Sequence, residues 1–98
     1  MVKVVNRRYT YPLTGDVYIG RPGPFGNPFV IGRDGTREQV IEKFSFYLHE
    51  NPDIAFELWK LKPKRLVCFC APEACHGDVY AEALEGWGFE ERGVVGDD

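Results

Sequence analysis

The sequence has no long apolar run and no surplus of positive charge. Its 12 Lys and Arg residues face 15 Asp and Glu residues, which gives a formal net charge of −3. Nonspecific nucleic-acid binding needs an excess of Lys and Arg, so this balance disfavours that class of protein and leaves only a local basic patch as an alternative. No charged, apolar leader precedes Val2, and no apolar run approaches membrane-spanning length. We therefore expect a cytoplasmic protein without a membrane partner.

Cysteine is also scarce, and internal repeats and low-complexity segments are absent. The three cysteines are an odd number, and Cys68 and Cys70 lie too close along a strand to form a comfortable disulfide. Reduced thiols are expected. The 98 residues suffice for one domain, and seven Phe, five Tyr and two Trp residues indicate a folded core. The sequence thus predicts a single domain over residues 1–98.

Short β-prone runs predict the strands of this domain. They lie at residues 2–5, 16–20 and 66–70, and the unbroken apolar run 66–70 is typical of a strand that is buried on both faces. Residues 29–31 are a candidate either for a brief strand or for a segment that plugs the core. Residues 21–28 hold three prolines and two glycines, which exclude both a helix and a central strand.

Helical periodicity predicts three helices. Thr36 and Gln39 match a capping box, and apolar residues follow on one helical face. Asn51 and Pro52 fit the N-cap and first position of a second helix, and a third is expected at about 76–87. Residues 89–98 are interpreted as a tail.

The spacing of these elements predicts an α/β fold. Two helices lie between the second and third strands, and this connection is long enough for a crossover between parallel strands. We predict a short, partly parallel sheet flanked by three helices. Parallel strands share one carboxyl edge, so the 21–28 loop and the 70–78 segment are expected to face the same crevice, where open α/β sheets bind ligands.

Four motifs resemble those of a family of small phage and bacterial proteins that is described only as a domain of unknown function. The motifs are Ile19-Gly-Arg-Pro22, Gly26-Asn-Pro-Phe29, Thr36-Arg37 and the run from Leu66 to Asp78. The resemblance extends from about residue 15 to residue 87. It implies a compact α/β domain, often encoded by phages, and no particular activity. Its signature positions correspond to Arg21, Asn27, Cys70, Cys75 and His76.

The cysteine-rich segment supports two hypotheses about chemistry. In the first, Cys68, Cys70, Cys75 and His76 form a Cys₃His zinc site, since residues two apart on a strand point to the same face. Their spacing departs from the usual paired-cysteine pattern, and buried strands also carry cysteine as a small apolar residue. In the second, Cys75 is a catalytic nucleophile whose pKa is lowered at a helix start, with His76 as its proton carrier.

A third hypothesis, which we favour, is a pocket for a nucleotide, phosphate or other anion. Arg21 supplies a planar, bidentate donor, Asn27 both donates and accepts, and Cys70 and Asp78 complete the predicted ligand-binding set. The helix start at residues 75–77 adds backbone N–H groups. The loop lacks the ending of a P-loop, and an ordered Pro-Gly loop whose polar side chains bind its own carbonyls explains it equally well.

The competing function is a zinc-stapled interaction module that binds a host protein or single-stranded nucleic acid. The local basic cluster around residues 60–65 is the sequence feature that favours nucleic acid, although a solvated turn also accounts for it. Sequence alone leaves open whether the protein is an enzyme and which cofactor it uses, with zinc as the named candidate.

Overall fold

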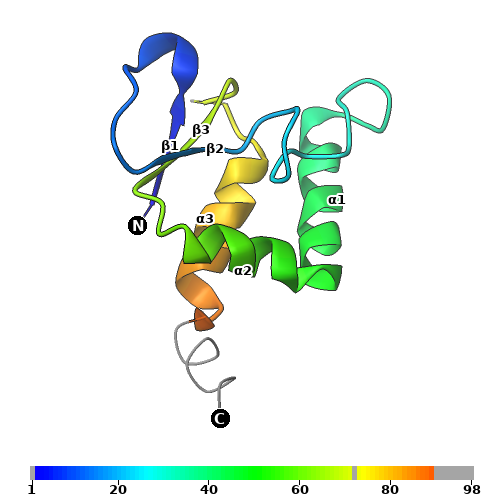
Figure 1. The fold of residues 1–98 in the computed structure, drawn as a ribbon. Helices are drawn as coiled ribbons and strands as arrows, with labels where there is room; N and C mark the ends of the chain where they lie inside the picture. Colours follow the sequence, from blue (N-terminus) through cyan, green and yellow to red (C-terminus); the bar gives the residue numbers. More distant parts are fainter. Residues whose placement is uncertain (1, 72, 90–98) are drawn as a thin grey trace.

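The computed structural model describes residues 2–71 and 73–89 of the chain. Within this part it contains three β-strands, one 3₁₀-helix and three α-helices (Figure 1). In chain order they are β1 (Lys3–Asn6), η1 (Arg7–Tyr9), β2 (Asp16–Tyr18), α1 (Arg37–Glu50), α2 (Pro52–Lys60), β3 (Arg65–Cys68) and α3 (His76–Gly86).

The three strands form one sheet in the order β1-β3-β2, and both pairs are parallel. Leu66 at the centre of β3 lies opposite Val4 of β1 and Val17 of β2. The apolar run of β3 is buried because a neighbouring strand covers each of its edges and α3 packs against the sheet. The predicted α/β class and parallel crossover are confirmed.

Three strand predictions differ from the structure. β2 ends at Tyr18 rather than at residue 20. Residues 29–31 form no strand: Ile31 makes only an isolated bridge to Gly35, beside a turn in which Asp34 binds Val30, and Phe29 packs against the core. The Asp34 carboxylate accepts the backbone N–H of Val30 at 2.8 Å. β3 ends at Cys68 rather than at residue 70, so Phe69 and Cys70 lie on the segment that leaves the sheet.

Helix α3 lies between the sheet and α1 (Figure 1). It packs against β1 and β3 on one side and against α1 and α2 on the other. Phe44 of α1 and Tyr80 of α3 are completely buried where these helices meet. Phe89 is also buried, at 1 % exposure, and contacts Phe56 of α2. The predicted tail of residues 89–98 thus begins with a buried side chain, and residues 90–98 lie outside the described residues.

The basic cluster at residues 60–65 is largely engaged by intramolecular contacts. Arg65 makes an ion pair of 2.7 Å with Asp16 of the neighbouring strand. This hydrogen-bonded guanidinium lowers the pKa of Asp16 to about 2. Lys60 pairs with Glu57, and the Lys62 ammonium lies 3.7 Å from the centre of the Trp59 ring. These contacts favour a structural role for the cluster.

Across residues 2–71 and 73–89, no helix has the length and apolar character needed to span a bilayer.

Gly77 lies where α3 packs closely against the sheet. A Cβ at this position would lie 2.9 Å from side-chain carbons of Ile19 and Val4 and 3.2 Å from the Cys75 sulfur. We expect Gly77→Ala to lower the free energy of unfolding by about 1–3 kcal/mol through overpacking. Urea unfolding followed by circular dichroism measures this change.

Gly86 of the same helix provides the matched control. A Cβ there meets no atom within 4 Å, so Gly86→Ala should be neutral or add up to about 1 kcal/mol of stability through helix propensity. Equal stabilities for the two variants would contradict the close packing at Gly77.

Candidate functional site

A pocket of about 330 Å³ opens at the carboxyl ends of β2 and β3. Three segments form its walls: the loop of residues 20–31, the segment of residues 68–76, and the first turns of α1. The structure thus places the Pro-Gly loop beside the cysteine segment, as the parallel-strand argument predicts. The predicted site residues that line the pocket are Arg21, Asn27, Cys68, Cys70, Cys75 and His76.

Arg21 lies on the loop and lines this pocket, and one nitrogen of its guanidinium is hydrogen-bonded to carbonyls of the same loop. Its Nη1 donates to the carbonyl of Asn27 at 3.0 Å and, more weakly, to that of Phe29 at 3.4 Å. No carboxylate of residues 2–71 and 73–89 makes an ion pair with Arg21. The side chain is therefore fixed in direction while its positive charge stays uncompensated within this part of the chain.

Asn27 has a structural role in the pocket wall. Its side-chain oxygen accepts the backbone N–H of Phe29 at 2.9 Å, and its amide nitrogen lies 3.4 Å from the carbonyl of Val40 on α1. The residue is buried, with 8 % of its surface exposed. These contacts hold the loop against α1, so the amide predicted to grip a ligand is already committed to the fold.

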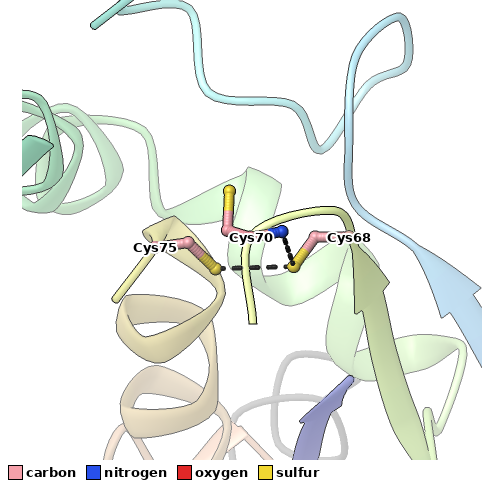
Figure 2. A group of neighbouring side chains, drawn as sticks. All are labelled: Cys68, Cys70 and Cys75. Atoms are coloured by element: carbon pink, nitrogen blue, oxygen red, sulfur yellow. Dashed lines mark hydrogen bonds between the residues drawn. The ribbon is translucent and has the colours of Figure 1, made fainter. Parts of the chain in front are cut away.

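The three cysteines lie together at the junction of β3 and α3, where the sulfurs of Cys68 and Cys75 face each other and that of Cys70 points away from the pair (Figure 2). The Cys68 and Cys75 sulfurs are 3.6 Å apart, and all three sulfurs lie within 4.8 Å of one another. Cys68 and Cys75 are buried, whereas Cys70 is half-buried. The three cysteines are free thiols. Their positions allow them to hold a metal ion.

The contact between Cys68 and Cys75 shifts their pKa values in opposite directions. The hydrogen bond with the Cys75 thiol, assisted by the backbone N–H of Cys70, lowers the pKa of Cys68 to about 6 against the opposing effect of burial. The same contact and burial raise the pKa of Cys75. This contact thus opposes the predicted lowering of the pKa of Cys75 at the helix start.

His76 is turned away from the thiols. Its Nε2 lies 2.8 Å from the carbonyl oxygen of Ile19 and 3.1 Å from that of Phe25. Both partners are acceptors, so Nε2 carries the proton and donates. Burial lowers the pKa of His76, and the nearby charge of Arg21 acts in the same direction. The ring is thus a neutral tie between α3 and the loop, and its Nε2 is unavailable as a base or a metal ligand.

Two predictions about the cysteine segment differ from the structure. Neither ring nitrogen of His76 belongs to the group of thiols that could hold a metal ion, so the predicted Cys₃His set reduces to three cysteines. Asp78 is not among the residues that line the pocket; its carboxylate accepts the backbone N–H of Cys75 at 3.2 Å and completes a capping box with the Cys75 sulfur. A catalytic role for Cys75 and His76 stays a prediction.

Several residues of the pocket are missing from the sequence-based prediction. Arg37 lines the pocket; it donates to the carbonyl of Ala74 at 3.1 Å and pairs with Glu73 at 2.8 Å. The Thr36-Arg37 motif was the available signal. Asn6, at the end of β1, donates to the carbonyls of Phe69 and Ala71 and so fixes the segment that carries Cys70.

The lining combines positive charge with aromatic surface. Its permanently charged side chains are Arg21 and Arg37, and among the described residues that line the pocket none is Asp or Glu. This is notable in a protein with a net charge of −3. Tyr18, Phe29 and Phe69 add aromatic faces, and Phe69 is 50 % exposed. The pocket is therefore electrostatically suited to an anion.

Comparison with known proteins places this architecture in a family. The family model described as "Domain of unknown function (DUF4326)" matches residues 4–86, which include all three strands and all three α-helices except for Lys3 at the start of β1. The chain belongs to this family. The resemblance inferred from the motifs is confirmed, and the match begins earlier in the chain than the motifs indicated.

A relative in this comparison comes from Enterobacteria phage T4. It is the "Uncharacterized 12.4 kDa protein in nrdA-td intergenic region", and it is 34% identical to this chain over 89 residues. The match covers 86% of this chain and 78% of the relative. No solved structure matches the chain. The DUF4326 domain is thus phage-associated.

Proposed function

We propose that this DUF4326 protein binds a small anionic ligand, of which a nucleotide fits the pocket best. One observation carries this proposal: two arginines and no carboxylate are found among the described residues that line the pocket. Arginine provides directed N–H donors that match the oxygens of phosphate and carboxylate groups. The charge of Arg21 is the stronger argument, because Arg37 is partly compensated by Glu73.

The shape and the aromatic lining narrow the ligand class. A volume of about 330 Å³ lies at the lower end of the range for small-molecule pockets. Phe69 packs edge-to-face against Tyr18, and the Arg8 guanidinium lies 6.0 Å from the Phe69 ring centre. Exposed aromatic faces beside arginines suit a heteroaromatic base attached to an anionic group. These features favour a nucleotide over inorganic phosphate.

The test is nucleotide binding by wild-type protein and by Arg21→Gln. Isothermal titration with nucleoside mono- and triphosphates, and with inorganic phosphate, measures affinity directly, and thermal shifts provide a second readout. Loss of one charge-assisted hydrogen-bonding group should weaken nucleotide binding by about 10-fold to 100-fold. The stability of the unliganded protein should change little, because Arg21 is exposed.

Lys60→Gln is the matched control. It removes one positive charge from α2, which contributes no residue to the pocket. Its nucleotide affinity should equal that of the wild-type protein. Equal losses of nucleotide affinity in Arg21→Gln and Lys60→Gln would show that only the overall charge matters, which would contradict a site at Arg21. The absence of binding by any anion tested would contradict it too.

A further inference from the structure

We propose that Cys68, Cys70 and Cys75 bind one Zn²⁺ ion and leave its fourth coordination position open toward the pocket. The proposal concerns the three sulfurs at the junction of β3 and α3 (Figure 2). It differs from the Cys₃His site predicted from sequence, because His76 is excluded and the ion is accessible to a ligand. Only the identity of that ligand rests on the proposed function.

The sulfur positions fit a tetrahedral thiolate site. Zinc–sulfur bonds of about 2.3 Å at tetrahedral angles separate the sulfurs by about 3.8 Å. The Cys68 and Cys75 sulfurs are 3.6 Å apart, and the largest separation within the group is at most 4.8 Å. Cys70 is half-buried and lies on the segment beyond β3, so a small rotation of its side chain can close the remaining gap. The buried pair is already placed at the required distance.

Backbone N–H groups support two of the sulfurs. The N–H of Cys70 points at the Cys68 sulfur at 3.4 Å, and the N–H of Gly77 points at the Cys75 sulfur at 3.3 Å. Hydrogen bonds of this kind orient metal ligands and stabilise the negative charge of thiolates. Asn6 holds the intervening segment through the carbonyls of Phe69 and Ala71. The site is thus ordered by the fold before any ion binds.

The fourth position has no protein ligand among the described residues. His76 is the nearest candidate in sequence, and its Nε2 is held by the carbonyls of Ile19 and Phe25. No described His, Asp or Glu joins the group of sulfurs. All three cysteines line the same pocket as Arg21. Three protein ligands with an open position characterise zinc sites that bind an exogenous molecule, whereas structural staples have four.

An ion with an open position would give the pocket a second means of holding an anion. Zn²⁺ accepts an oxygen or nitrogen of the ligand directly, and Arg21 can donate to another part of the same molecule from the loop. Soft thiolate ligands favour zinc over magnesium and calcium. A nucleotide that reaches both the sulfur cluster and Arg21 is the occupant that the proposed function implies.

The first experiment is elemental analysis of the full-length protein purified under reducing conditions with zinc in the growth medium. We expect one zinc per chain. Cys70→Ser should weaken zinc binding by more than about 100-fold. This exceeds the loss expected when a residue that only hydrogen-bonds to a metal ligand is removed. Because Cys70 is half-buried, this variant should keep the circular dichroism spectrum of the wild-type protein. His49→Gln is the control for adventitious surface binding and should retain zinc fully.

The second experiment tests the open position with cobalt in place of zinc. The thiolate-to-cobalt absorption should match three thiolates, and azide should shift the visible bands by entering the fourth position. A cobalt spectrum unaffected by azide would overturn the open site in favour of a closed staple. Fully reduced wild-type protein that binds no zinc under titration would overturn the metal site itself, and stoichiometric iron or copper would overturn the assignment to zinc.

These outcomes are separable from those of the proposed function. Zinc content and the azide response are measured without nucleotide, so they can succeed even if Arg21→Gln leaves nucleotide binding unchanged. Conversely, nucleotide titrations of chelator-treated protein test the arginine-lined pocket without metal. Zinc-free protein that binds nucleotide with undiminished affinity would support the pocket and contradict a ligand bound to the ion.

Discussion

Phe44→Ala is expected to lower the free energy of unfolding by about 3–5 kcal/mol, the usual cost of deleting a buried aromatic side chain. Phe44 is completely buried, and its ring contacts the rings of Tyr47, His76 and Tyr80. It therefore joins α1 to the beginning of α3, where the pocket lies. Urea unfolding monitored by tryptophan fluorescence measures the change.

Phe46 provides a control of the same residue type on the same helix. It is 65 % exposed, so Phe46→Ala should change the free energy of unfolding by less than about 0.5 kcal/mol. A small effect at Phe44, or comparable effects at both positions, would contradict the packing of α1 against α3.

His76→Leu is expected to cost about 2–4 kcal/mol of stability, although leucine preserves apolar volume. The substitution removes the donor from the buried carbonyl of Ile19, and an unsatisfied buried acceptor costs about 1–3 kcal/mol. The carbonyl of Phe25 keeps the hydroxyl of Tyr80 as a donor at 3.0 Å. Loss of the edge contacts to Phe44 and Tyr80 adds to the penalty.

The other histidine of the chain serves as the comparison for this prediction. His49 is exposed near the end of α1, so His49→Leu should have a much smaller effect on unfolding by urea. The zinc content of His76→Leu provides an independent readout. A variant that stays as stable as wild type but loses zinc would show that His76 is a metal ligand rather than a tie between α3 and the loop.

Local sequence signals predicted most of the fold. The capping box at Thr36 and Gln39 is present, and Pro52 begins α2. The apolar run at Leu66 forms the central strand, as expected for a segment covered on both faces. These predictions succeeded because each depends on periodicity or on a backbone preference of neighbouring residues. Phe89 was missed because its burial depends on aromatic partners from α2.

The site was predictable in position but only partly in chemistry. Parallel strands place their carboxyl ends together, and this alone brought Arg21 near the cysteine segment. The roles of individual side chains depend on contacts between distant segments. Sequence adjacency suggested that Cys75 and His76 act together, yet the thiol pairs with Cys68 and the ring binds carbonyls of the loop. Neither partner can be read from the neighbouring residues.

The central place of β3 also determines when the sheet can assemble. Both strands that pair with it precede it in the chain, and they do not pair with each other. During synthesis β1 and β2 must wait for residues 65–68 to emerge from the ribosome before either gains a hydrogen-bonding neighbour. The sheet and the thiol cluster at its edge are thus completed in succession by adjoining stretches of the nascent polypeptide, residues 65–68 and 68–75.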